Sequence, residues 1–174
     1  IEALREEPVV LVSNTFPDSG IVETLLMLDA IQDVRSGRLQ NLREIGPQTL
    51  PDVGKGVILA VPYFGYSRQD KRFKPGESIS ARAIADVLAT RCDGMVVLDL
   101  HAPAVLSDMS IPVAFTTAMP ELAHHLKETV NPDFILSPDK GAIDRASSVA
   151  NQINCEFSYL EKTRIDAHTI VHQA

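Results

Sequence analysis

Short apolar runs alternate along this chain with longer segments in which apolar residues recur every three or four positions. The runs predict β-strands at residues 8–14, 56–65, 95–101, 111–118, 133–141 and 155–164, the fifth of which ends in a turn. The periodic segments between them predict helices at residues 19–37, 77–94, 120–130 and 142–154. Strands that alternate with helices favour an α/β fold built on a parallel, doubly wound sheet.

Individual residues indicate how these helices begin, end and pack. Ser19 is a candidate N-cap for the first helix, Gly94 should close the second, and Pro120 should lie in the first turn of the third. The inward faces of the first, second and fourth helices are expected to carry, in turn, Ile21, Leu25 and Leu28; Ile84, Val87 and Leu88; and Ala146, Val149, Ala150 and Ile153. The polar stretch at 37–56, broken by Gly and Pro, predicts a surface excursion.

The composition is that of an ordinary globular chain. Its 174 residues, 45% hydrophobic and 22% charged, suffice for one good-sized domain or two small ones. A net charge of −7 argues against a general nucleic-acid or membrane-surface role, since both need a basic surface. No apolar run approaches a membrane span, and Cys92 and Cys155 stand in no metal-like spacing. We therefore expect a cytoplasmic protein with two buried free thiols.

Ligands of parallel α/β sheets bind beyond the carboxyl ends of the strands, so the residues that follow each strand are the candidates for chemistry. The stretch YSRQDKRFKPGE carries Arg68, Lys71, Arg72 and Lys74 within seven residues. Guanidinium and ammonium groups pair with phosphate oxygens, so this basic loop suits an anionic ligand. The alternative is a solvated charged turn.

Three further strand ends carry polar groups. In DLHAP, Asp99 and His101 would share one face of an extended strand, as a metal or proton-transfer pair or as a structural hydrogen bond. In LSPDKGAIDRA, Asp139 opens a helix, where it could hold Mg²⁺ beside a phosphate or simply cap the helix. In LEKTR, Lys162 and Arg164 alternate, so they could stabilise a transferring phosphoryl group together or be two surface charges.

Taken in order, PYFGYSRQDKRFKPGESISARAIADVLA, VVLDLHAP, ILSPDKGAIDRA and LEKTR closely resemble the ribose-phosphate pyrophosphokinase family. The resemblance covers nearly the whole chain, and the short EKTR form is similar to that of the archaeal branch. It implies a sheet of phosphoribosyltransferase type in two similar half-domains, both incomplete. Their expected bounds are residues 1–114 and 115–174.

The resemblance also implies an activity, namely transfer of the diphosphoryl group of ATP to the C1 hydroxyl of ribose 5-phosphate, which leaves AMP. By motif match, Arg68, Gln69, Asp70 and His101 would form the ATP site, with Asp70 supporting the loop. His101 and Asp139 would ligate Mg²⁺ or lie in its second shell. A homo-oligomer is expected from the family.

Two cations in the EKTR motif complete the implied site. Lys162 would be the principal catalytic cation, stabilising charge on the phosphoryl oxygens. Arg164 would act with it and contact ribose 5-phosphate.

The chain departs from the family pattern at several positions. Ser110 and Ala114 stand where acidic residues are common, and Ala142 replaces the second Gly after the SPD turn. The family's FPDGE segment and its ribose-phosphate loop are absent, and the chain begins with Ile1 and ends just after a strand-like run. We therefore expect a piece of a longer enzyme. A non-catalytic, synthase-associated regulatory protein is the alternative. A phosphoribosyltransferase of related fold would lack YSRQDK.

Overall fold

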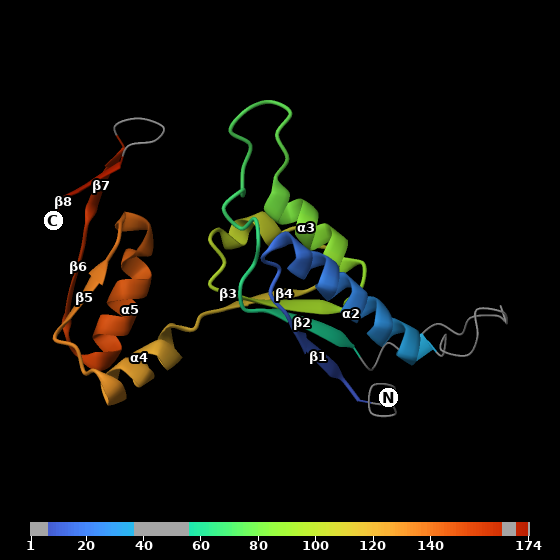
Figure 1. Cartoon of the computed structure of the whole chain (residues 1–174), viewed down its shortest axis with the longest axis horizontal. Coiled ribbons are helices and arrows are strands. Elements are labelled where there is room, and N and C mark those ends of the chain that lie inside the picture. Colours follow the sequence, from blue (N-terminus) through green and yellow to red (C-terminus); the bar gives the residue numbers. More distant parts are fainter. Residues whose placement is uncertain (1–6, 37–55, 165–169, 174) are drawn as a thin grey trace. The chain divides into compact units, whose positions relative to one another are not determined.

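The computed structural model describes residues 7–36, 56–164 and 170–173, and gives the backbone alone for 162–164 and 170–173. The predicted excursion at 37–56 falls almost wholly outside the described residues. Contacts within the chain divide it into two compact units, Ile1–Thr116 and Thr117–Ala174, which are treated separately below (Figure 1). The division falls two residues from the half-domain boundary expected from the sequence. None of the helices in the described part of the chain is long and apolar enough to cross a membrane.

The first unit is built on a four-stranded parallel sheet. Its strands are β1 (Val9–Val12), β2 (Val57–Val61), β3 (Gly94–Leu98) and β4 (Val113–Thr116), and they lie in that order across the sheet. Leu11 pairs with Leu59, Leu59 with Met95, and Met95 with Val113, so one row of apolar residues crosses all four strands. The predicted parallel α/β class is confirmed.

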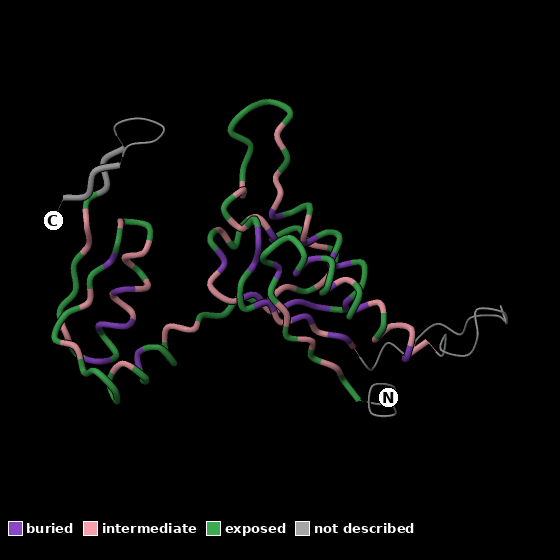
Figure 2. Tube along the Cα trace, viewed as in Figure 1, coloured by how far each residue is buried: buried purple, intermediate pink, exposed green. Residues whose placement is uncertain are grey.

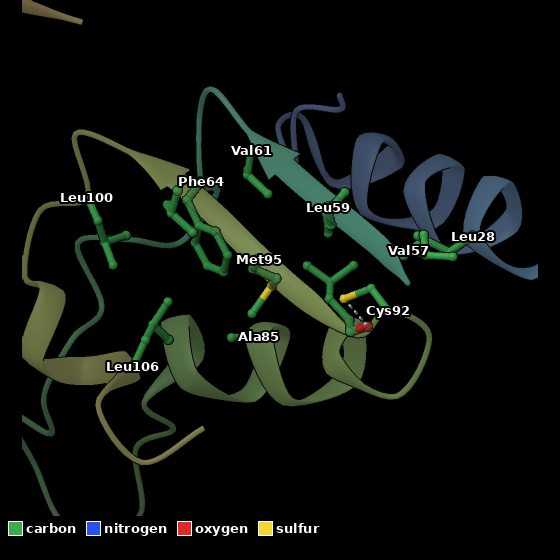
Figure 3. Packing of buried hydrophobic residues seen from close by; sticks show 12 residues of the cluster. Leu28, Val57, Leu59, Val61, Phe64, Ala85, Cys92, Met95, Leu100 and Leu106 are labelled. Carbon is green, nitrogen blue, oxygen red and sulfur yellow. Dashed lines mark hydrogen bonds between the residues drawn. The ribbon is translucent and has the colours of Figure 1, made fainter. Parts of the chain in front are cut away.

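Two helices, α2 (Asp18–Ser36) and α3 (Ser80–Ala89), pack on the same face of this sheet. Figure 3 shows Leu28 of α2 beside Val57, and Ala85 of α3 near Met95, in one buried cluster. Because strand order follows chain order, right-handed crossovers carry both helices to one side.

The opposite face of the sheet is open within the described residues. Val10 and Val12 on β1 are 61% and 65% exposed, so the first strand is half-buried on one face and exposed on the other (Figure 2). Parallel sheets are usually covered on both faces.

Three predictions about the ends and inward faces of the helices are wrong. Ser19 lies within α2, which begins at Asp18, and so does not precede the helix as its cap. Gly94 begins β3 and does not close α3, because α3 ends earlier, where Thr90 Oγ1 donates to the carbonyl of Val87 at 2.7 Å. Val87 is 46% exposed, whereas Leu88 is fully buried as expected.

The second unit contains α4 (Met119–Thr129), β5 (Phe134–Ser137), α5 (Ile143–Ile153), β6 (Glu156–Tyr159), β7 (Glu161–Arg164) and β8 (Ile170–Gln173). Strands β5 and β6 are parallel, whereas β7 and β8 form an antiparallel pair. Val149 and Ile153 of α5 pack with Ala123 of α4, and the predicted inward face of α5 is buried throughout. Pro120 lies in the first turn of α4, as expected. The strand predicted at 155–164 is broken at Leu160.

Candidate functional site

The carboxyl ends of the four parallel strands of the first unit lie on one edge of the sheet. The segments that follow β1, β2 and β3 therefore meet there, and they include the basic loop after β2 and His101 after β3.

A short turn after β1, residues 14–18 (the anchor turn), holds the beginning of the segment that leads from β2 into the basic loop. Thr15 is 1% exposed, and its Oγ1 accepts a hydrogen bond from Gly65 N at 2.7 Å. The same hydroxyl donates to the carbonyl of Tyr63 at 3.5 Å, and Thr15 N donates to it at 3.2 Å. Asn14 Oδ1 accepts from Tyr63 N at 2.9 Å. Two segments about fifty residues apart in sequence are thus joined.

The backbone at this junction is packed without spare room. A Cβ placed on Gly65 would lie 2.1 Å from the carbonyl oxygen of Thr15, so the close approach requires glycine. Tyr66 adopts a left-handed backbone conformation (φ 61°), and its hydroxyl donates to Asp18 Oδ2 at 3.1 Å. This hydrogen bond, with the carboxylate charge, raises the pKa of Tyr66 above its ordinary value. Phe16 meets the ring of Tyr63 edge-on, with centroids 5.7 Å apart.

Beyond the junction, the basic loop is held by its own backbone. Gln69 N donates to the carbonyl of Tyr66 at 2.9 Å, and Ala81 at the start of α3 donates to the carbonyl of Gln69 at 3.3 Å. Further along, the Glu77 carboxylate accepts from the backbone of Phe73 and Lys74 at 3.0 and 3.1 Å. The loop therefore has a defined path on both sides of Arg68.

The cations of this loop point outward. Arg68, Lys71, Arg72 and Lys74 are exposed, and none of the four forms an ion pair with a carboxylate in the described part of the chain. Lys71 instead lies 5.4 Å from the ring centre of Phe73. The loop contains two carboxylates: Glu77 accepts from backbone N–H groups, and Asp70 forms no ion pair with these four cations in the described part of the chain. Exposed, unneutralised cations at a strand end are what an anionic ligand would require.

Asp70 occupies a different position from Arg68. It is half-buried and lines a cavity of about 230 Å³ between the loop, α3 and the short 3₁₀ helix η1 (Pro103–Leu106). The other lining residues are Ile79, Arg82, Ala104, Val105, Asp108 and Met109. This placement accords with support of the loop rather than with contact at its tip.

The proposed pairing of Asp99 and His101 along one strand face is wrong. β3 ends at Leu98, and Asp99 has a left-handed conformation (φ 46°), so strand alternation no longer applies. Asp99 N donates to the carbonyl of Thr116 at 2.9 Å, which fixes the chain as it leaves the sheet. His101 is exposed at the same edge as the basic loop.

In the second unit, Asp139 caps the short 3₁₀ turn η2 (Lys140–Ala142) that leads into α5. Its Oδ1 accepts from Gly141 N at 2.9 Å, and its carbonyl accepts from the buried Ser137 hydroxyl at 2.7 Å. The predicted capping role of Asp139 is therefore confirmed, because its carboxylate accepts this backbone hydrogen bond. Helix starts are positions where phosphate groups, and carboxylates that hold Mg²⁺ beside them, are commonly found.

Strand β7 starts at the same sheet edge as the Asp139 turn. β5 and β6 are parallel, and Leu160 N, at the start of the step into β7, donates to the carbonyl of Ser137. Lys140 forms a 3.1 Å ion pair with Glu161, which raises the pKa of Lys140. The backbone of Lys162 and Arg164 is extended, as the prediction for these two residues requires. In the register of the antiparallel strands β7 and β8, Lys162 lies opposite His172.

The Mg²⁺ prediction rests on His101 and Asp139, which belong to different units. Within the described residues, no three His, Cys, Asp or Glu side chains gather closely enough to hold a metal by themselves. Mg²⁺ commonly takes one or two protein carboxylates and completes its shell with water and substrate phosphates. A lone carboxylate at a helix start, as at Asp139, fits that pattern of ligands.

Sequence reasoning missed the anchor turn. Thr15 and Asp18 belong to no spacing motif, and their partners lie far along the chain. The available signal was a polar SNT directly after an apolar strand, together with a Gly at position 65 directly before the basic loop. Parallel pairing of β1 with β2 brings these two strand ends together.

Comparison with known proteins identifies relatives of this chain. The model of one protein family, the N-terminal domain of ribose phosphate pyrophosphokinase, matches residues 53–91, which include the basic loop. The ribose-phosphate pyrophosphokinase of Sulfurisphaera tokodaii is 33% identical over 92% of this chain and 50% of its own length. That of Methanothermobacter thermautotrophicus is 34% identical over 97% of this chain and 53% of its own length. The crystal structure of phosphoribosylpyrophosphate synthetase from Mycobacterium smegmatis superimposes with a TM-score of 0.65 at 25% identity, covering 95% of this chain and 50% of that one.

The parallel α/β fold and its structural match define an α/β protein of phosphoribosyltransferase type. Within that class, the resemblance to ribose-phosphate pyrophosphokinases is confirmed, and the relatives named above that match by sequence are archaeal. The chain spans about half the length of the curated relatives it matches. These relatives carry an enzyme's name, so the regulatory alternative is not favoured.

Proposed function

We propose that the longer protein to which this chain belongs transfers the diphosphoryl group of ATP to ribose 5-phosphate. The products are 5-phosphoribosyl 1-diphosphate and AMP, for use in nucleotide biosynthesis. The observation that carries the proposal is the basic loop after β2, whose exposed cations lack carboxylate partners in the described part of the chain and whose path is fixed by backbone hydrogen bonds. The relatives that this chain resembles are named ribose-phosphate pyrophosphokinases, after the same reaction.

In the proposed reaction, the C1 oxygen of ribose 5-phosphate bonds to the β-phosphorus of ATP. The bond from that phosphorus to the bridging oxygen of AMP breaks, and the hydroxyl proton is lost. Arg68 and Gln69 bind the nucleotide, and Asp70 supports the loop from its cavity. His101 completes the nucleotide side of the site. Such catalysis is mostly positioning and charge stabilisation.

The charge that develops on the transferred group is stabilised by cations on β7. Lys162 is assigned the principal role, and Arg164 acts with it and contacts the phosphate of ribose 5-phosphate. Mg²⁺, held by His101 and Asp139 directly or through water, would neutralise part of the polyphosphate charge. We place the protein in the cytoplasm as a homo-oligomer that uses ATP and ribose 5-phosphate, without nucleic-acid or membrane partners.

The test is an AMP-release assay on the full-length protein with ATP, ribose 5-phosphate and MgCl₂. Replacing Lys162 by Ala should lower kcat by about 10²–10³, the usual cost of losing one group that stabilises transition-state charge. Lys127→Ala, which removes an exposed cation from α4, serves as the matched control and should leave the rate unchanged. If the full-length protein releases no AMP when the divalent metal and the phosphate concentration are varied, the proposed activity is refuted.

A further inference from the structure

The anchor turn contains a buried hydroxyl that the proposed reaction does not use. Thr15 is one of three buried polar residues in the described part of the chain, and its hydroxyl is bonded to the segment before the basic loop. A buried hydroxyl makes both of its hydrogen bonds only where its partners are placed for it. Here the partners are Gly65 N and the carbonyl of Tyr63.

We propose that Thr15 is a positioning residue for the nucleotide, which acts by fixing where the basic loop leaves the sheet. The inference rests on the proposed function, because it takes Arg68 and Gln69 to be the groups that meet the phosphates. Thr15 itself touches neither substrate.

The path from Thr15 to those groups is short and continuously bonded. Thr15 fixes Gly65, and Ser67 N and Gln69 N then donate to the carbonyls of Phe64 and Tyr66 at 3.4 and 2.9 Å. Each of these turns starts from a residue at the junction. A shift at Gly65 is therefore passed along the backbone to Arg68, three residues further on. Misplacement of a binding group by about 1 Å is enough to cost large factors in rate.

Two substitutions of Thr15 differ in whether they keep its hydroxyl group. Valine matches threonine in shape but can neither accept from Gly65 N nor donate to Tyr63, so Thr15→Val leaves a buried N–H without its partner. Serine keeps the hydroxyl, so Thr15→Ser preserves both bonds. The pair distinguishes the hydrogen bond from the volume of the side chain.

A matched control lies in the neighbouring helix. Thr24 is also fully buried, and its hydroxyl donates to the carbonyl of Gly20 at 2.6 Å and lies 2.7 Å from Ser13 Oγ. Neither partner belongs to the basic loop. Thr24→Val thus removes a buried hydroxyl from the same unit, beside the anchor turn, without removing any of the hydrogen bonds that join this turn to residues 63–65.

The experiment measures ATP dissociation constants and Tm for the full-length protein and its variants, with the KM for ribose 5-phosphate as a second readout. Thr15→Val should weaken ATP binding about tenfold and leave the KM for ribose 5-phosphate within about twofold, a difference equivalent to about 1.4 kcal/mol for ATP. Thr15→Ser should restore binding. Thr24→Val should lower Tm without weakening ATP binding.

The outcomes separate the two proposals. If Thr15→Val and Thr24→Val change ATP binding equally at equal loss of Tm, Thr15 is structural and the inference is wrong. If Arg68→Ala leaves ATP binding unchanged, the proposed function fails at its own site. Should Thr15→Val not fold, Asn14→Ala takes its place, because it removes the exposed 2.9 Å bond to Tyr63 N. That variant should weaken ATP binding two- to threefold, and unchanged binding would refute the inference.

Discussion

Replacing Gly65 by Ala should damage the junction between β1 and β2 more than any ordinary glycine substitution. The added Cβ would lie 2.1 Å from the carbonyl oxygen of Thr15, whereas ordinary contacts begin at 3.4 Å. The two segments must therefore separate by about 1.3 Å. The hydrogen bond from Gly65 N to Thr15 Oγ1, now 2.7 Å, would open to about 4 Å and be lost.

The cost has two parts. Overpacking of a close contact costs about 1–3 kcal/mol. A buried N–H without a partner costs about 1–3 kcal/mol more. Together they predict a loss of about 2–6 kcal/mol, a large share of the roughly 5–15 kcal/mol that stabilises a typical domain. The loss should appear as a lower urea midpoint, accompanied by weaker ATP binding because the basic loop begins here.

Gly56→Ala provides the comparison at the other end of β2. Its Cβ would meet Asp93 at 3.5 Å, an ordinary contact, so the free energy of unfolding should change by no more than about 0.5 kcal/mol. If Gly65→Ala is as well tolerated as Gly56→Ala in both urea midpoint and ATP binding, the junction yields easily and the reasoning from close packing is refuted.

Two further predictions concern groups with shifted pKa values. Burial raises the pKa of Cys92 to about 11. At pH 8 a thiol reagent should therefore label only the half-buried Cys155 in the folded protein, and both thiols in denaturant. Labelling of Cys92 in the folded protein would contradict this prediction. The same shift adds stability below pH 9 that is lost between pH 9 and about 11, which thermal melts can follow. For Tyr66, the bond to Asp18 holds the phenol protonated above its ordinary pKa of 10.0, so its stabilising effect is complete below pH 10 and disappears as pH rises further. Asp18→Asn should lower the pKa of Tyr66 in an ultraviolet titration referenced to Tyr66→Phe, and an unchanged pKa would show that the bond is not made in solution.

Periodicity in the sequence predicted the elements but not always their ends. α5 is the clearest success, because its small and apolar residues repeat with a helical period and all of them are buried. The prediction for Gly94 was wrong because a glycine can equally end a helix or begin a strand, and α3 already ends at its C-cap Thr90, four residues earlier. The spacing of apolar residues alone does not predict the residue at which a helix ends and the next strand begins.

For the candidate site, too, some predictions from the sequence agree with the structure and others do not. The motif placed Arg68 and Asp139 at strand ends, where the structure has them. It misjudged Asp99, since strand alternation assumes that the strand continues and the left-handed turn at this residue ends it. The polar SNT after the first apolar run marks Thr15 as a strand-end residue, but its partners could not be predicted locally, because they depend on pairing between strands far apart in sequence.

The order of the strands in the first sheet has a consequence for biosynthesis. Each strand from β1 to β4 lies beside the one made just before it, so every new strand leaving the ribosome finds its partner already synthesised. Among the described strands, none must wait for a later segment to be inserted between two neighbours. This part of the sheet can therefore grow from β1 toward β4 during translation, and a chain cut off after β4 still carries the hydrogen bonds that pair these four strands.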